Sequence, residues 1–317
     1  MTASAPGAVP TPALALAAAR AATGRVPAEV RRFRTGVAHH VYEAPFDDDR
    51  PSIVVRMGTS EQRAGLAEGV RLNRLLRPLG VPLPEVLAAG LDEPIPWVAL
   101  ERLPGTDLDH VIGALPDGQL RAVAEGVAAA QAGAARAGSA GRYGYAAVLA
   151  AAPHPRWSGV LEANLARSRA RIQAAGLFET GPVETVAGLV ERRRDELDAV
   201  PATAFLHDTT MKNVIVAPDG TLSGVVDVDD LCWGDPRYAP ALTLAVLLAY
   251  GGPPEYVGHW MRAAGHRDDG LFRLYVALFL VDLMGEHGQR FNGNERPSTP
   301  EARDQLLRAF EKAEPHA

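Results

Sequence analysis

The segment Leu206–Asn213 gathers side chains that phosphoryl transfer requires. It reads Leu-His-Asp-Thr-Thr-Met-Lys-Asn, with four residues between Asp208 and Asn213, and another carboxylate, Asp227, ends the next long apolar run. Phosphoryl transfer from ATP needs a carboxylate that orients the attacking hydroxyl and accepts its proton, oxygen ligands for Mg²⁺, and a cation on the donor phosphates. The spacing therefore predicts a base and a metal ligand side by side on one loop, facing a second carboxylate at the end of the following hairpin.

These side chains need a framework, and the chain divides into a β-rich first part and a helical second part. A helical pattern at 12–22, β-like runs at 30–37, 40–45, 52–57, 86–90 and 97–103, and an amphipathic helix at 61–76 predict a small antiparallel sheet with one main helix. Beyond a hinge at 104–106, helical patterns cover 119–137, 156–175, 182–199, 237–250, 255–264, 271–287 and 299–311, with short β-like pieces between 202 and 230. We expect an α+β fold of two lobes, residues 1–103 and 104–317, with a ligand cleft at the hinge.

The composition argues against several classes of protein. The chain has 317 residues, of which 47% are hydrophobic and 22% are charged, and this composition is typical of a globular protein. Its formal net charge of −6 argues against general nucleic-acid binding. Its single cysteine, Cys232, permits no internal disulfide. The most apolar stretch, 271–284, is interrupted by charges and too short to span a membrane, and the amino terminus lacks the basic start of a signal peptide. We expect a cytoplasmic protein that binds neither nucleic acid nor membrane and acts as a monomer, with a homodimer as the alternative.

The loop, Asp227 and the downstream Trp233-Gly234-Asp235-Pro236 together resemble the aminoglycoside phosphotransferase superfamily, bilobal relatives of the protein kinases. The resemblance covers most of the chain. It implies a protein-kinase-like fold, ATP and Mg²⁺ as cofactors, and a hydroxyl group of a small molecule as the phosphate acceptor. It also implies that Asp208 is the catalytic base and that Asn213 and Asp227 are the magnesium ligands.

The same resemblance implies a nucleotide site in the first lobe. Arg56, in Val-Val-Arg-Met, lies where the family has the Lys or Arg of its third strand, and Glu68 lies where it has the partner of that cation. The segment Leu100–Gly105 resembles the connection between the lobes, whose backbone contacts adenine, and so implies contacts at Glu101 and Leu103.

Lysine is scarce in this chain, because Lys212 and Lys312 are its only two. The first lobe must therefore hold phosphates with an arginine, and the strand position selects Arg56, whose planar fork can hold two phosphate oxygens. Lys212 lies inside the proposed catalytic loop. It would either contact the transferring phosphate as charge develops or remain a surface lysine beside the cleft.

Four further carboxylates have two interpretations each. Asp229 and Asp230 would contribute auxiliary contacts to metal or substrate, or form a solvated turn after Asp227. Asp282 and Glu286 lie one helical turn apart in a late apolar helix, where they would receive an amine or a polyol. The alternative is a buried Asp282 paired with an arginine such as Arg273 or Arg290.

Three features depart from the family pattern. Leu206 and His207 stand where His and Gly usually precede the base, the loop at 35–40 is poor in Gly and Asn, and Ala239 replaces a common Asp after Tyr238, so that a structural contact is missing or replaced. The main hypothesis is a kinase that phosphorylates an aminoglycoside-like antibiotic, another natural product, a sugar or an amino alcohol. The departures support the alternative, a catalytically weak kinase-like module that binds nucleotide or a small ligand.

Overall fold

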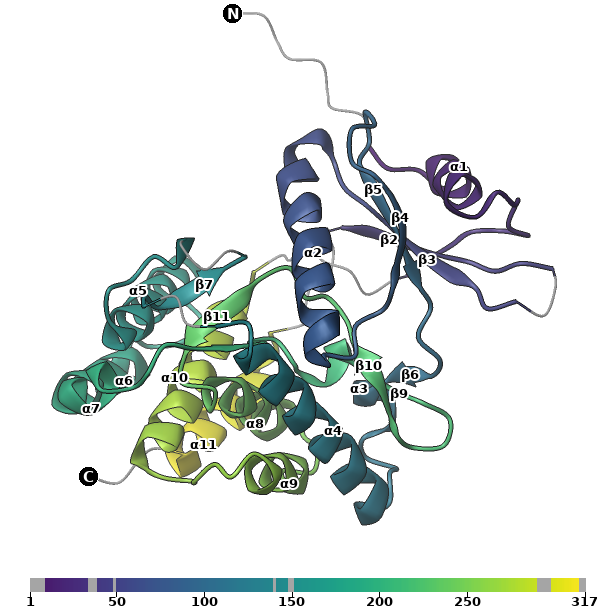
Figure 1. Cartoon of the computed structure of the whole chain (residues 1–317). Coiled ribbons are helices and arrows are strands. Elements are labelled where there is room, and N and C mark those ends of the chain that lie inside the picture. Colours follow the sequence, from purple (N-terminus) through teal and green to yellow (C-terminus); the bar gives the residue numbers. More distant parts are fainter. Residues whose placement is uncertain are drawn as a thin grey trace, which may run out of the picture.

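The structure is a computed structural model that describes residues 9–33, 39–47, 50–138, 141–147, 151–289 and 298–313. A small sheet flanked by helices forms one part, and a larger, mainly helical part adjoins it (Figure 1). The predicted α+β architecture is confirmed. None of the helices within the described ranges has both the length and the hydropathy needed to cross a bilayer.

The first part is an antiparallel sheet with the strand order β1-β2-β3-β5-β4. Its strands are β1 (Arg31–Arg32), β2 (His40–Ala44), β3 (Ile53–Met57), β4 (Val86–Gly90) and β5 (Trp97–Glu101). Alternate residues of β3 are buried against α1 (Pro12–Thr23), which places Arg56 on the other face of the sheet. On that face, Leu66 and Val70 of α2 (Arg63–Leu76) pack against Val98. Short 3₁₀ turns, Ser60–Gln62 and Arg77–Leu79, flank α2.

The chain leaves the first sheet at Gly105, and only glycine fits there. Gly105 has a φ of 107°, and a Cβ atom on it would lie 1.9 Å from the Val216 carbonyl oxygen. This close approach lets β6 (Thr106–Asp107) join β9 (Val214–Val216) and β10 (Leu222–Val225) in a second sheet of order β10-β9-β6. The predicted division at 103/104 falls where the chain passes between the two sheets.

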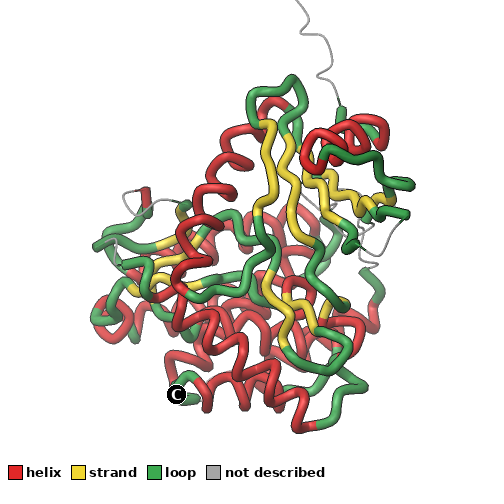
Figure 2. Tube along the Cα trace, turned by 45° about the vertical axis from the view of Figure 1, so that its right-hand side comes forward, coloured by secondary structure: helices red, strands yellow, loops and turns green. Residues whose placement is uncertain are grey.

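The helical part surrounds α10 (Gly270–Glu286), whose side chains are nearly all buried. Helices α5, α8 and α11 pack directly on it, and the tube in Figure 2 shows helices dominating this part. A third sheet, β7-β11-β8, consists of β7 (Gly144–Ala146), β11 (Leu231–Gly234) and β8 (Thr203–Phe205). The other helices are α3 (Leu108–Val111), α4 (Asp117–Ala135), α5 (Trp157–Ala175), α6 (Gly181–Arg192), α7 (Arg194–Asp198), α8 (Tyr238–Tyr250), α9 (Glu255–Ala263) and α11 (Pro300–Ala313).

The structure corrects several predicted elements. The helix expected at 182–199 is interrupted at Arg193, which leaves the helical region with a φ of −107° and a ψ of 17°. The strand expected at 222–228 ends at Val225, because Asp227 adopts a left-handed conformation. Strands β7 and β11 were not predicted, since each is short and pairs with segments distant in sequence. The phosphate-covering loop predicted at 35–40 lies largely outside the described residues.

Candidate active site

A cleft of about 1120 Å³ lies between the first sheet and the helical part. Its lining residues come from both parts of the chain, as the hinge position predicted. Among the predicted site residues, the following line it: Arg56, Glu101, Leu103, Asp208, Lys212, Asn213, Asp227, Asp230, Asp282 and Glu286. The site is therefore assembled from segments more than 200 residues apart.

The loop after β8 holds Asp208 and Asn213 together. Asn213 ends the 3₁₀ turn Met211–Asn213, and its side-chain amide donates to the carbonyl oxygen of Asp208, which precedes the turn, over 3.0 Å. The Thr210 hydroxyl donates to Asp208 Oδ1 over 2.8 Å, and the Val226 N–H donates to the Asn213 carbonyl oxygen over 2.9 Å. These bonds orient the predicted base, leave the Asn213 amide oxygen as an acceptor, and fasten the loop to the segment that carries Asp227.

Asp227 is the one residue other than glycine with positive φ among those the structure describes, at 60°. Asp tolerates this conformation better than most residues, and such local strain clusters at functional sites. Desolvation by the cleft walls raises the pKa of its carboxyl group; the Arg56 guanidinium opposes this rise, and the carboxylates of Asp229 and Asp208 add to it. Its side chain remains 60% exposed, so the carboxylate is accessible to a cation in the cleft.

The residues present fit a magnesium site. Carboxylate and amide oxygens are suitable ligands, and Mg²⁺ usually takes only one or two protein carboxylates and completes its shell with water and phosphate oxygens. Asn213 and Asp227 offer such a set, joined through the Val226–Asn213 hydrogen bond. Within the described ranges, no group of three or more His, Cys, Asp or Glu side chains is arranged to hold a metal ion.

Arg56 reaches from β3 toward the catalytic segment, but its partner differs from the prediction. Its guanidinium donates to Asp229 Oδ1 over 2.8 Å and lies 3.0 Å from Asp227 Oδ1. Glu68, the predicted partner, instead forms an ion pair with Arg71 and does not line the cleft. The prediction failed because Arg71 lies three residues along the same helix and reaches Glu68 directly. Asp229 therefore has the role expected of Glu68.

His39 completes the surroundings of Arg56. Its Nδ1 lies 2.6 Å from Arg56 Nη2, and burial, together with the nearby guanidinium, lowers its pKa to about 4. The imidazole is therefore neutral at pH 7, and Nδ1 can accept a hydrogen bond from Arg56. The sequence analysis did not identify this contact.

The side of the cleft predicted to bind the nucleotide is apolar where the connection between the parts begins. Val41, Val54, Leu100 and Leu103 line it, and they provide a surface on which a flat base can pack. Glu101 borders the same region, but both its main-chain N–H and its carboxylate bond to Glu85. These two groups of Glu101 therefore join the end of β5 to the residue that precedes β4. A nucleotide contact by Glu101 remains a prediction.

On the opposite side, two predicted substrate carboxylates are paired within the protein. Asp282 accepts from the Ser168 hydroxyl over 2.8 Å and lies 3.4 Å from Arg167. Of the two arginines suggested by the sequence, Arg273 pairs with Asp268, and Arg290 lies outside the described residues. The partner comes from α5 because that helix packs along α10.

Asp230 lies 3.2 Å from His207 Nδ1. Desolvation alone would lower the pKa of His207, but the contact with Asp230 and the carboxylates of Asp208 and Asp227 raise it overall. The imidazole that replaces the usual glycine also packs edge-on against Tyr145, with ring centroids 4.8 Å apart. His207 thus forms part of the cleft wall beside the predicted base.

Gln131 of α4 is a positioning residue that the sequence did not reveal. Its buried amide donates to the Leu206 carbonyl oxygen over 2.7 Å and accepts from the Leu206 N–H over 2.9 Å. The same nitrogen donates to Thr209 Oγ1 over 3.1 Å. One glutamine therefore holds the backbone of Leu206, before Asp208, and the side chain of Thr209, after it. No local signal marks Gln131, because it lies in an alanine-rich helix 75 residues before Leu206.

We expect Gln131→Leu to lower kcat at least about tenfold with little change in the KM for ATP. The variant leaves two buried backbone groups of Leu206 unpaired and loosens the loop that orients the base, and small misplacements of reacting groups cost large factors in rate. Steady-state kinetics measures this split. Gln119→Leu is the matched control, since Gln119 lies on the same helix and bonds to the exposed turn at Asp219. Equal losses in both variants, or a change confined to the KM for ATP, would contradict the assignment.

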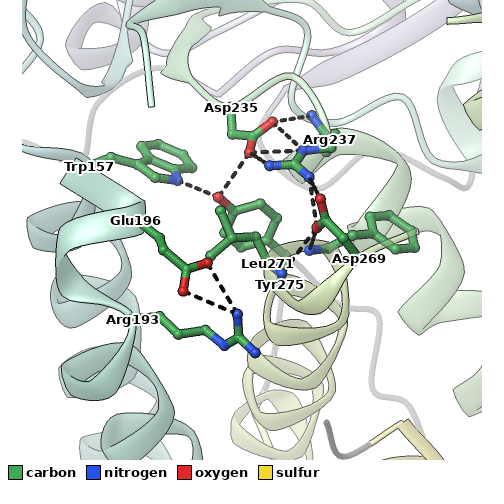
Figure 3. A network of polar contacts seen from close by, with 9 residues as sticks. Trp157, Arg193, Glu196, Asp235, Arg237, Asp269, Leu271 and Tyr275 are labelled. Carbon is green, nitrogen blue, oxygen red and sulfur yellow. Dashed lines mark hydrogen bonds and ion pairs between the residues drawn. The ribbon is translucent and has the colours of Figure 1, made fainter. Parts of the chain in front are cut away.

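A network of polar contacts holds the segment that precedes Tyr238 (Figure 3). Asp235 is buried and accepts hydrogen bonds from Arg237 and from the Tyr275 hydroxyl, each at 3.0 Å. Arg237 continues to Asp269, the N-cap of α10, and the Trp157 indole donates to Tyr275 over 2.9 Å. Asp235 therefore braces the segment after β11 against α10, which favours the structural interpretation of this residue over contact with substrate.

Comparisons with known proteins agree with this arrangement. The sequence profile of the phosphotransferase enzyme family matches residues 29–275, whereas no curated protein matches the chain in sequence. A thermostable mutant of aminoglycoside phosphotransferase APH(4)-Ia, solved with AMP-PNP and hygromycin B, is 18% identical with a TM-score of 0.65, covering 95% of this chain and 99% of that one.

Two further solved structures are similar over most of their lengths. The ternary complex of APH(2")-IIa with streptomycin and ATP is 14% identical with a TM-score of 0.64, covering 96% of this chain and 99% of that one. APH(3'')-Id from Streptomyces rimosus, in complex with ADP and streptomycin, is 18% identical with a TM-score of 0.56, covering 85% and 97%. The expected protein-kinase-like fold is confirmed.

Proposed function

The chain belongs to the phosphotransferase enzyme family, and we propose that it transfers the γ-phosphoryl group of ATP, with Mg²⁺, to a hydroxyl group of a small molecule. One observation carries the proposal: hydrogen bonds join Asp208, Asn213 and the segment of Asp227 on one wall of the cleft, and Arg56 reaches them from the other part of the chain. This set contains each group that phosphoryl transfer requires.

In the proposed reaction, the residues act mainly by positioning and by electrostatics. Asp208, held by Thr210, accepts the proton of the acceptor hydroxyl while the hydroxyl oxygen attacks the γ-phosphorus. The bond between this phosphorus and the β,γ-bridging oxygen breaks, and ADP leaves. Asn213 and Asp227 would hold Mg²⁺, which would neutralise charge on the phosphates. Arg56 would bind donor phosphate oxygens with its planar guanidinium group, and Lys212, which is exposed at the cleft, is available for the transferring group.

The acceptor set comprises aminoglycoside-like antibiotics, other natural products, sugars and amino alcohols. Solved relatives bind hygromycin B or streptomycin, which supports a natural product as one member of this set. A kinase-like module that binds nucleotide without turnover is the competing proposal, and the histidine beside the base favours it. We further propose that the chain acts as a cytoplasmic monomer, where ATP is available.

We expect ATP consumption that depends on both Mg²⁺ and an acceptor in a screen of antibiotics, sugars and amino alcohols. The product should gain the mass of one phosphoryl group, which mass spectrometry detects. Chelation of Mg²⁺ by EDTA should abolish turnover, and restored Mg²⁺ should recover it. Thermal stabilisation by MgATP without any phosphorylated product across the screen would favour the binding module instead.

A further inference from the structure

We propose that the acceptor is an amphipathic alcohol, a molecule with a broad apolar face and without several positive charges. The inference rests on the proposed function, because it concerns the acceptor side of the same cleft. It narrows the acceptor set and argues against strongly cationic members.

An apolar wall forms this side of the cleft. Leu242, Val246 and Tyr250 recur every fourth residue along α8, so they lie on one face of that helix, and all three line the cleft. Phe279 and Leu283 of α10 line it as well, and α8 packs along α10. The two helices thus present five apolar side chains, which we call the apolar wall, to the space that an acceptor would occupy.

The apolar wall begins beside the reacting groups. Thr243 of α8 lies between Leu242 and Val246 in sequence. The Thr243 hydroxyl donates to the Thr209 carbonyl oxygen over 3.5 Å. Thr209 directly follows the predicted base. An acceptor that presents its hydroxyl to Asp208 would therefore place the neighbouring part of the molecule against Leu242 and Val246. Without a bound acceptor, these two side chains are only half-buried. A fully polar molecule would leave this surface poorly covered.

The charges on the same side do not favour a polycation. Asp282 is already engaged by Ser168 and Arg167, and Asp230 by His207. Several ammonium groups would have to replace these internal partners and lie beside the Arg167 guanidinium. Glu286, one helical turn beyond Asp282, lines the same cleft.

The test compares matched alcohols by calorimetry on the full chain with Mg²⁺ and AMP-PNP. The probes are n-hexyl β-D-glucoside, methyl β-D-glucoside and streptomycin. We expect the hexyl glucoside to bind at least about tenfold more tightly than the methyl glucoside, because added methylene groups in an apolar pocket are worth factors of this size. Leu242→Asn should reduce that ratio about tenfold while the affinity for AMP-PNP stays unchanged.

Leu248→Asn is the matched control, since Leu248 is a half-buried residue of the same helix that does not line the cleft. Val246→Thr, which keeps the side-chain shape, serves if Leu242→Asn does not fold. Tighter binding of streptomycin, equal or absent binding of the two glucosides, or equal effects of Leu242→Asn and Leu248→Asn would overturn the inference. Failure to bind AMP-PNP would instead overturn the proposed function, so the two failures are distinguishable.

Discussion

Replacement of Asp208 by Asn is expected to lower kcat for phosphoryl transfer by about 10³-fold, with affinity for MgATP nearly unchanged. The variant removes the carboxylate that accepts the acceptor proton, and general-base catalysis typically contributes 10²–10⁴-fold. The fold should remain intact, because an Asn side-chain oxygen can still accept the hydrogen bond that Thr210 donates. Kinetics of product formation and calorimetry of nucleotide binding measure the two quantities separately.

The matched control is Asp304→Asn, which removes one carboxylate from an exposed position on α11. It should leave kcat and nucleotide affinity within about twofold of the natural protein, since exposed charges far from the cleft contribute little. If Asp208→Asn retained substantial turnover, Asp208 would not be the base. The proposal would then lose its central residue.

Asp227→Asn should abolish the effect of Mg²⁺ on nucleotide binding and lower kcat by at least about 100-fold. Asn keeps the size of the side chain and tolerates the φ of 60° at this position, so that the change isolates the negative charge. A metal ion supplies several kcal/mol of transition-state stabilisation in such reactions. The measurement is the dissociation constant of ATP and the rate of transfer, each determined across a series of Mg²⁺ concentrations.

Asp219→Asn is the control for this second variant. Asp219 occupies the turn at the other end of the β9–β10 hairpin, where an Asn oxygen can still accept from Thr221. It should retain the natural response to Mg²⁺. An unchanged response in Asp227→Asn would show that this carboxylate does not bind the metal, and the hairpin would then have a structural role.

Much of the architecture followed from local patterns. Strand β4 and helices α5, α8 and α10 lie within about two residues of their predicted bounds. Local residues set these bounds, because Gly176 and Gly251 end α5 and α8 and Asp269 caps the start of α10. The failures were of another kind. Strands β7 and β11 were not predicted. Both are short, and they are strands only because β11 pairs with β7 on one side and with β8 on the other.

The candidate site shows the same division. The sequence by itself indicated the loop of Asp208 and Asn213 and the carboxylate at Asp227, because these residues lie at fixed spacings along one segment. The resemblance to the phosphotransferases added Arg56 in its strand. Only the tertiary structure decided that Asp229 and not Glu68 pairs with Arg56, that Gln131 holds the Leu206 backbone before the base, and that Arg167 engages Asp282. These three contacts join helices or strands far apart in the chain. Their partners depend on how whole elements pack, and no spacing within a single segment specifies that.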